Sequence, residues 1–576
     1  MMKGKMAEQP SRKKPDLTAW TRIASVLFIG AAILMYVKQD VPQFAPLPMK
    51  SLEVDPDLTS IRSLNAKAGA LRGRSVIVVT LDTTRPDRLG CYGDPDISDI
   101  DTPTIDRLAR EGILFSNAVA TAPATLPSHA SIFTGLYPPN HGARSNGLEP
   151  LAEDQQTLAE AFSSHGYDTA AFVSAFVLAE RYGLAQGFTH YDDQLGEAST
   201  VGGYTERSAN ETTDRAIAWI KQARSRPFFL WVHYFDPHQG HNPPEPFASQ
   251  HAHPYDGEIA SMDHELGRLL ETVDAATRSE PLIVVTADHG EGLGEHGEWS
   301  HGFLAYESTL QIPLIMHAPN TIGRGQHFAQ RVSQVDLMPT IGALFDLELQ
   351  NPLDGVDLLQ PQDPNRVVFA EAVYGQTSFG WAVLSVLYRG SLKYIHGPDP
   401  ELYDLDRDPL EDKNINRVRP RVVLELAREL ERLPGALELL HSTQDEADID
   451  PAEAARLEAL GYVMPTVRQI DRKQSGPDPK EMLPLMTEVG RIVASVGADE
   501  SEPLWKNWLG RILGQRRSLG QAIGELEEIA ARHPGFAPVH QYLGLLYKRD
   551  GREDDYQRAR ARLKEAIASP GRRTAE

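Results

Sequence analysis

Residues 121–142 read TAPATLPSHASIFTGLYPPNHG. Proline is favoured at the first position of a helix and glycine just past its end, so Pro127 and Gly135 predict a short helix over residues 127–134. Thr125 then lies at the mouth of this helix, where unpaired N–H groups and the positive end of the helix dipole favour an anion. A hydroxyl there is well placed to attack a bound phosphate or sulfate. The alternative is that Thr125 only caps the helix.

Three apolar runs, one before this stretch and two after it, each end in an aspartate. They cover residues 75–82, 226–236 and 281–288. Continuous apolar runs of this kind are typical of strands buried on both faces of a parallel sheet. Helices are predicted between them at residues 103–111, 157–165 and 212–223. This alternation predicts a doubly wound α/β sheet with its site at the carboxyl ends of the strands, where Asp82, Asp236 and Asp288 are expected to meet.

The central stretch resembles the signature of the sulfatase family, in which Cys or Ser is followed by x-Pro-x-Arg and by a helix that ends in TGxYPxxHG. This chain keeps four parts of that signature, namely Pro127, Thr134-Gly135, Tyr137-Pro138 and His141-Gly142. Thr125 stands at the nucleophile position and His129 at the arginine position. The family's Cys or Ser is oxidised to formylglycine, a route that is closed to threonine. A threonine nucleophile is instead similar to the phosphate-transferring branches of the alkaline phosphatase superfamily.

The resemblance runs, motif by motif, from Ser75 to Asn414. It implies a doubly wound mixed sheet of alkaline phosphatase/sulfatase type in a catalytic domain at residues 75–365. A smaller subdomain is expected at residues 366–418. It contains ELYDLDRDP, residues 401–409, which resembles the closing motif of sulfatases, and that motif lies in a small antiparallel sheet.

A metal site is predicted from Asp82, Asp288 and His289 together with Thr125. Two carboxylates, one imidazole and an alkoxide suit a divalent cation that binds a substrate oxygen and lowers the pKa of the nucleophile. Sulfatases follow the first aspartate with a second one, whereas this chain has Thr83. This exchange weakens a calcium-type pocket, which needs many carboxylate oxygens.

A second metal site is implied by the resemblance. In the phosphate-transferring relatives an Asp, a His five residues later and a distant His bind a second ion, and Asp236, His241 and His301 match this pattern. We expect two ions, zinc or manganese, and calcium or magnesium if there is only one. The alternative is that His241 and His301 contact the substrate without a metal.

Three further residues are expected to take part in catalysis. His238, in the segment DPHxxxxPP, is the best general acid or anion contact, because the equivalent histidine of sulfatases contacts the substrate. His129 is included because it takes the place of the signature arginine. Asn146 is expected to hold a nonbridging oxygen of the bound ester.

The composition excludes several classes of protein. A chain of 576 residues is too long for one ordinary core, so two or three domains are expected. Its 80 acidic and 57 basic residues give a formal net charge of -23, which disfavours nucleic acid as a partner. The single cysteine, Cys91, rules out an internal disulfide framework.

The N-terminal part is predicted to be a membrane anchor. Residues 1–22 form a basic flank, and the apolar run at residues 23–38 is expected to span the membrane once. A cleaved signal peptide is the alternative, but no small-x-small cleavage site closes the run. Positive flanks stay in the cytoplasm. We therefore expect an inner-membrane protein with a tether at residues 39–74 and a periplasmic catalytic domain.

The C-terminal part is predicted to be helical. A helical linker is expected at residues 419–485 and a tetratricopeptide-like region at residues 486–576. In this region YLGLLY, residues 542–547, resembles the LGxxY core of the repeat. One clear unit is fewer than a free-standing solenoid needs, so the tail either packs on the main domain or binds a protein partner.

These motifs predict a membrane-anchored, metal-dependent hydrolase or transferase that acts on anionic phosphate or sulfate esters. Thr125 attacks the ester to form a covalent intermediate, which water or an acceptor alcohol resolves. One alternative is a sulfuric ester hydrolase, that is, a sulfatase. The other is a non-catalytic scaffold that uses its helical tail.

Overall fold

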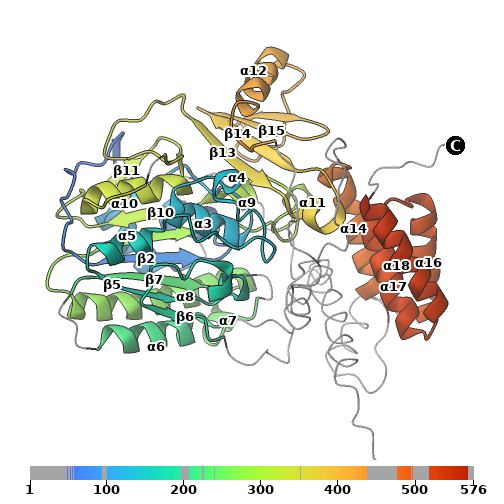
Figure 1. Cartoon of the computed structure of the whole chain (residues 1–576), viewed down its shortest axis with the longest axis horizontal. Coiled ribbons are helices and arrows are strands. Elements are labelled where there is room, and N and C mark those ends of the chain that lie inside the picture. Colours follow the sequence, from blue (N-terminus) through green and yellow to red (C-terminus); the bar gives the residue numbers. More distant parts are fainter. Residues whose placement is uncertain are drawn as a thin grey trace, which may run out of the picture.

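The computed structural model describes residues 58–93, 100–195, 207–222, 226–238, 241–350, 352–437, 476–494 and 518–568, together with Met49, Leu52, Asp55 and Val496. These residues form a nine-stranded mixed sheet covered by helices, a four-stranded antiparallel sheet and a C-terminal group of helices (Figure 1). The predicted fold class, a doubly wound α/β sheet with a small antiparallel sheet and a helical tail, is confirmed.

The strands that carry two of the predicted aspartates lie at the centre of the large sheet. β2 (Val76–Leu81) pairs in parallel with β7 (Phe228–Tyr234) on one side and with β8 (Leu282–Ala287) on the other. All residues of β2 are buried, as a continuous apolar run predicts. The last residues of β2 and β8 lie opposite each other, so Asp82 and Asp288 leave neighbouring strands at the same level.

The outer strands make the sheet mixed. The order is β1-β11-β3-β10-β8-β2-β7-β5-β6. The outer strands are β1 (Thr59–Ile61), β3 (Ile113–Phe115), β5 (Asp168–Phe172), β6 (His190–Asp192), β10 (Leu314–His317) and β11 (Gln326–Phe328). β10 runs antiparallel to both of its neighbours, and the other pairs are parallel. A separate three-stranded sheet consists of β4 (Ala118–Val119), β9 (Gln311–Ile312) and β12 (Val332–Ser333).

Helices cover both faces of the large sheet, each face over its own hydrophobic core (Figure 1). The first face carries α2 (Pro103–Glu111), α6 (Ala209–Ile220) and α8 (Pro254–Ala276). The second carries α3 (Thr125–Thr134), α5 (Leu158–Ser164) and α10 (Leu337–Phe345). Three shorter helices are α4 (Pro138–His141), α7 (Phe247–Gln250) and α9 (Glu307–Leu310). Alternate residues of β2 enter the two cores, as the period of a strand requires.

The predicted small sheet follows the main domain. It is antiparallel and consists of β13 (Val367–Ala372), β14 (Leu384–Arg389), β15 (Leu392–His396) and β16 (Glu401–Asp404). Two helices flank it, α11 (Tyr374–Phe379) and α12 (Pro420–Leu430). The side chain of Lys393, on β15, is fully buried, and its ammonium lies 2.9 Å from Glu307 and 2.7 Å from Glu411. Because Glu307 belongs to α9, this buried charge ties the small sheet to the main domain.

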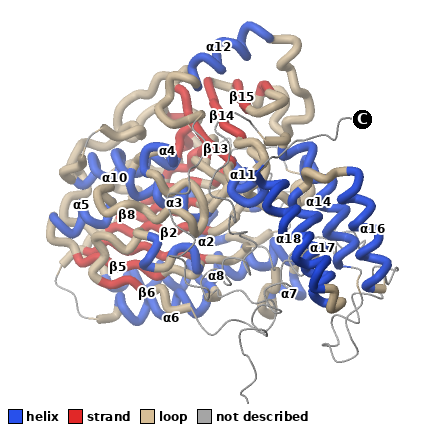
Figure 2. Tube along the Cα trace, turned by 45° about the vertical axis from the view of Figure 1, so that its right-hand side comes forward, coloured by secondary structure: helices blue, strands red, loops and turns tan. Residues whose placement is uncertain are grey.

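The C-terminal helices pack on α11 of the small-sheet part and on Phe303 of the main domain (Figure 2). They are α14 (Pro479–Ala494), α16 (Leu519–Arg532), α17 (Ala537–Arg549) and α18 (Glu553–Ala568). Their hydrophobic core includes Phe379 and Trp381, at and just after the end of α11. Trp381 stacks on Phe536 with ring centroids 6.3 Å apart, and it lies 5.3 Å from Phe303, two residues after His301. These contacts support packing on the main domain, while the repeat family and a protein partner stay predictions.

We expect Phe536→Ala to loosen the tail from the main domain. Loss of a buried aromatic ring destabilises a core by about 3–5 kcal/mol, and here the loss falls on the contact with Trp381. Limited proteolysis should cleave the variant within residues 476–568 faster than the wild type. Phe536→Leu, which keeps most of the apolar volume, is the matched control and should resist nearly as well. Equal cleavage of the alanine variant and the wild type would contradict the docked arrangement.

Within the part of the chain that the structure describes, no helix combines the length and the apolar character needed to cross a membrane. The predicted basic flank, residues 1–22, and the predicted anchor, residues 23–38, lie outside the described residues. So do most of residues 39–57 in the predicted tether and residues 438–475 in the predicted linker.

Candidate metal centre and active site

The predicted metal ligands Asp82, Asp288 and His289 come together at the carboxyl ends of β2 and β8. All three side chains are fully buried. The His289 Nε2 atom lies 3.6 Å from Asp288 Oδ2 and 3.9 Å from Asp82 Oδ1. These side chains lie close together because β2 and β8 are parallel neighbours, so the aspartates that follow them lie at the same edge of the sheet.

The hydrogen bonds of His289 leave a lone pair facing the carboxylates. Its Nδ1 atom lies 2.9 Å from the carbonyl oxygen of Gly290, which only accepts, so Nδ1 carries the proton. Nε2 of the neutral ring is then an acceptor. A histidine whose Nδ1–H is held by a backbone carbonyl is the usual form of a metal ligand.

Several buried acceptors at this point have no hydrogen-bond partner. They are both carboxylate oxygens of Asp82, Oδ2 of Asp288 and Nε2 of His289. Burial, and then the charges of Asp288 and Glu291, raise the pKa of Asp82 well above its ordinary value. Unpaired buried charge is strongly unfavourable, and converging lone pairs without a proton between them fit a cation. The donor set therefore fits the predicted divalent metal ion.

Thr83, next to the first ligand, has a strained backbone. Its φ of 52° is in the left-handed region, which is rare for a β-branched residue. The Thr83 N–H donates to Asp288 Oδ1 over 3.2 Å, and its carbonyl accepts from the Tyr255 hydroxyl over 2.7 Å. Its own hydroxyl is buried without a partner. The strain places this residue against the ligand cluster, where it fixes the orientation of Asp288.

Thr125 is the first residue of α3 and is almost fully buried. The helix begins two residues earlier than predicted, because Ala124, in extended conformation, is the N-cap. Gly135 ends it with a φ of 68°, as predicted. Asn146 accepts a hydrogen bond of 2.8 Å from the Leu126 N–H. The oxygen of Asn146 thus supports the start of the helix, and its predicted contact with the substrate stays a prediction.

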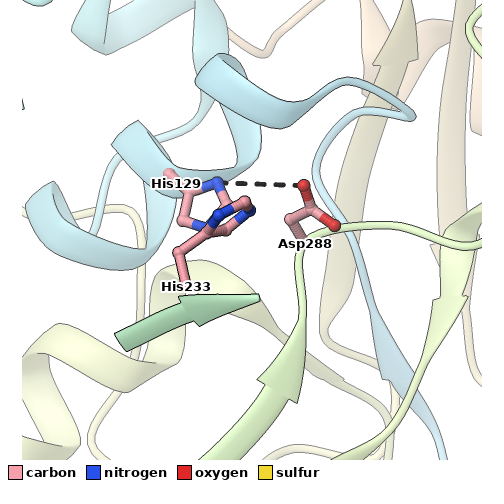
Figure 3. Close-up of side chains that lie close together, drawn as sticks. All are labelled: His129, His233 and Asp288. Carbon is pink, nitrogen blue, oxygen red and sulfur yellow. Dashed lines mark ion pairs between the residues drawn. The ribbon is translucent and has the colours of Figure 1, made fainter. Parts of the chain in front are cut away.

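His129 supports Thr125 through a chain of hydrogen bonds. Its Nδ1 lies 2.8 Å from the Thr125 carbonyl oxygen, and its Nε2 lies 2.9 Å from the hydroxyl of Thr80. The indole N–H of Trp231 donates to the same hydroxyl over 2.9 Å. Burial lowers the pKa of His129. Figure 3 shows this ring facing Asp288, with 3.9 Å between His129 Nδ1 and Asp288 Oδ2.

His233, which the sequence analysis missed, lies beside His129, with 5.1 Å between the two ring centroids (Figure 3). Its Nε2 atom is 3.4 Å from Asp82 Oδ2. The Ser174 N–H donates to Nδ1 over 3.3 Å, so Nε2 carries the proton of the neutral ring. The Nε2 atom of His233 thus lies close to Asp82 without a hydrogen bond to it. The sequence analysis did not single it out, because it lies within an apolar strand whose residues are expected to belong to the hydrophobic core.

His301 and His238 extend the site beyond His289. The ring centroids of His301 and His289 are 4.4 Å apart, and those of His301 and His238 are 5.1 Å apart. Glu291 Oε1 lies 3.1 Å from His301 Nδ1. Burial raises the pKa of Glu291 to about 8 and lowers that of His301 to about 4. Glu291 was missed by sequence reasoning, although its place directly after Asp-His-Gly is a usable signal.

The three residues predicted to bind a second ion do not converge. Asp236 Oδ2 accepts from the Ala209 N–H over 2.8 Å at the start of α6. His241 Nδ1 is 3.2 Å from Glu258 Oε2, and His301 is held by Glu291. Among the described residues, the groups with clustered ligand atoms are His129, His233 and Asp288, and Asp82, Asp288 and His289. Within that range, the predicted second ion has no converging set of ligands.

Comparison with known proteins shows which family the chain resembles. Residues 74–347 match the family model for sulfatases. The chain is 25% identical over 416 residues to the uncharacterized sulfatase YidJ of Escherichia coli, covering 59% of this chain and 82% of YidJ. It is 22% identical over 435 residues to the arylsulfatase of Clostridium perfringens, covering 59% of this chain and 90% of that protein.

Solved structures share the fold. The phosphonate monoester hydrolase of Agrobacterium radiobacter superposes with a TM-score of 0.52 at 22% identity, covering 62% of this chain and 95% of that one. A protein solved with its substrate D-glucosamine-2-N,6-O-disulfate gives a TM-score of 0.55 at 20% identity, covering 63% and 99%. Residues 74–347 therefore match the sulfatase family, and the chain shares the fold of solved sulfatases and phosphonate monoester hydrolases.

Proposed function

We propose that this protein is a membrane-anchored hydrolase or transferase that cleaves phosphate or sulfate esters with one divalent ion and with Thr125 as the nucleophile. The observation that supports this best is the convergence of unpartnered atoms from Asp82, Asp288 and His289. The helix that starts at Thr125 is tied to the same cluster through His129. A helix N-terminus and a cation together favour an anionic group at the hydroxyl.

Asp82, Asp288 and His289 would hold the ion, with the Thr125 hydroxyl as a further ligand. A bound ion supplies two effects, because it lowers the pKa of that hydroxyl and draws negative charge from the ester oxygens. Two carboxylates and one imidazole suit zinc or manganese. The Thr83 N–H holds Asp288 in orientation, and His233 lies 3.4 Å from Asp82.

In the proposed reaction the Thr125 oxygen forms a bond to the phosphorus or sulfur of the ester, and the bond to the leaving alcohol breaks. The Thr125 hydroxyl gives up its own proton to solvent water as this bond forms, and the departing alkoxide takes a proton from His238. The transferred group stays on threonine until water or an acceptor alcohol removes it. Threonine has no route through formylglycine, so a sulfate ester would follow the same path.

The test combines metal analysis with a panel of esters. Full-length protein should hold about one divalent ion per chain and should cleave at least one chromogenic phosphate or sulfate ester. Chelation should stop turnover, and added metal should restore it. His241→Ala should leave the metal content unchanged, because this ring is paired with Glu258. Two ions per chain, or a metal-free protein that binds none, would contradict the proposed site. The second result would favour the non-catalytic scaffold.

A further inference from the structure

The loop at residues 290–302 brings His301 into the candidate site. Five of its thirteen residues are glycine, so its backbone has many accessible conformations and needs contacts from outside to hold one of them. The ring centroid of His301 lies 4.4 Å from that of His289 and 5.1 Å from that of His238. A displacement of this loop would therefore disturb a proposed metal ligand and the proposed proton donor.

The end of the loop is fixed by Phe303. The Phe303 N–H donates to Glu298 Oε1 over 3.0 Å, which closes the loop on itself. Gly302 links His301 to Phe303 with a φ of 100°. A Cβ added at Gly302 would lie 3.3 Å from the side chain of Tyr374, so this link is closely packed. The position of the Phe303 ring therefore constrains that of the His301 ring.

The Phe303 ring packs against two hydrophobic cores at once. It contacts the core on the second face of the large sheet, and it also contacts the core of the C-terminal helices. Its neighbours on the side of these helices are aromatic. Its centroid lies 4.7 Å from that of Tyr374, 6.2 Å from that of Phe379 and 5.3 Å from that of Trp381. These four rings form an aromatic cluster between the loop and the C-terminal helices.

The C-terminal helices cover this aromatic cluster at α11 (Figure 2). Phe536, just before α17, stacks on Trp381 with 6.3 Å between the ring centroids and 13° between the ring planes. Phe379, Trp381 and Phe536 are each only 2% exposed. The Ala382 N–H donates to the Pro477 carbonyl over 2.9 Å, so the segment that leads into α14 is attached directly after Trp381. Without the C-terminal helices, the rings of Phe379 and Trp381 would face water, which favours their rearrangement.

We propose that the C-terminal helices are a positioning part of the active site. Through Phe536 and the aromatic cluster they hold the loop at residues 290–302, and with it His301, in place. The effect of this contact on turnover rests on the proposed function of the same site. Helices that served only to bind a protein partner could be loosened without moving this loop, so the two roles predict different results.

Amide hydrogen exchange tests this contact without any reaction. Phe536→Ala removes the ring that covers Trp381, whereas Phe536→Leu keeps most of the apolar volume. In the full chain, the alanine variant should exchange the amides of residues 292–304 about tenfold faster or more than the wild type, because local opening becomes easier. The leucine variant should stay close to the wild type. The amides of β2 should be unchanged in both variants, as expected if the main domain keeps its fold.

Two further variants locate the effect. Phe303→Ala removes the ring on the loop side and should loosen residues 292–304 to a similar extent. Because coupling between two parts is reciprocal, it should also speed exchange in α17, which keeps the test available if Phe536→Ala does not fold. Tyr556→Ala removes a ring from α18, where the Lys548 ammonium lies 5.3 Å from its centroid, and it should leave the loop unchanged. Faster exchange in α17 of Phe536→Ala without any change at residues 292–304 would overturn the inference.

Turnover shows whether the loop acts through His301. With a chromogenic ester that the wild type cleaves, and at saturating divalent ion, Phe536→Ala should lower kcat/KM by about tenfold or more, because a small misplacement of an active-site group is costly. In the His301→Gln background the same substitution should cost less than about twofold, because the residue that it misplaces is already lost. Equal losses in the two backgrounds would refute positioning through His301.

Failure of this inference is distinguishable from failure of the proposed function. If the wild type cleaves no ester, the proposed function fails, and the exchange of residues 292–304 still decides whether the C-terminal helices hold the loop. If the wild type cleaves an ester and Phe536→Ala is equally active, the inference fails and the proposed function stands.

Discussion

Thr125→Ala is expected to abolish ester turnover while the protein keeps its fold and its metal ion. The variant removes the attacking oxygen from the first residue of α3 but little packing, because Leu126 and Ala130 of this helix still fill the core. Enzymes that lose their nucleophile lose roughly 10³-fold or more in kcat. The measurement is kcat at saturating substrate and saturating divalent ion.

Two controls sharpen this prediction. Thr125→Ser keeps a primary hydroxyl at the same place and should retain part of the activity. Thr134→Ala removes the same atoms from the other end of α3, where the hydroxyl donates to the Ala130 carbonyl at 2.7 Å and accepts from the Leu136 N–H at 3.3 Å, and it should stay active. If Thr125→Ala turned over esters at nearly the wild-type rate, threonine would not be the nucleophile.

Asp82→Asn is expected to remove the metal ion and to lower turnover by roughly 10²-fold or more. Both oxygens of this carboxylate face the cluster without a hydrogen-bond partner, so the variant removes a ligand charge rather than a structural bond. Metal analysis after gel filtration is the direct measurement. Asp346→Asn, at an exposed aspartate that pairs with Arg72, is the matched control and should keep both the metal and the activity.

The same substitution should stabilise the ion-free protein at neutral pH. Burial raises the pKa of Asp82 well above its ordinary value, so the folded ion-free chain binds a proton that the unfolded chain releases near pH 4. Stability of the ion-free protein then falls as the pH rises above that value. Asparagine has no such proton, so the melting temperature of ion-free Asp82→Asn should be higher than that of ion-free wild type at pH 7 and about equal at low pH. A lower melting temperature at pH 7 would assign Asp82 a structural role.

The fold was predictable where the residue pattern of a single segment is enough to indicate its secondary structure. The apolar runs at residues 75–82, 226–236 and 281–288 became adjacent parallel strands because each of them is buried on both faces. Short strands such as β1 and β11 carry no comparable pattern, and they form through pairing, β1 with β11 and β11 with β3 as well. The docking of Phe536 on Trp381 also depends on residues far apart in sequence, which periodicity does not report.

The candidate site was predictable where strand ends define it. Asp82, Asp288 and His289 were found because a parallel sheet brings the ends of its strands to one edge. In the described residues the second set has other hydrogen-bond and ion-pair partners, so its two-ion arrangement stays a prediction. Asp236 lies two residues beyond β7 and turns to the start of α6, and the partner of His241, Glu258, lies on α8. A spacing rule carries no information about such competing partners.

Lys393 bears on how this protein can be divided. Its ammonium is fully buried in the small sheet, yet one of its counter-charges, Glu307, comes from the main domain. A cut near residue 365 would separate this buried ammonium from one of its two carboxylates and leave it only Glu411, so a buried charge pair between the two parts would be lost. The small sheet by itself is therefore not a unit that recombination can exchange between proteins. The unit of inheritance is the main domain and the small sheet together.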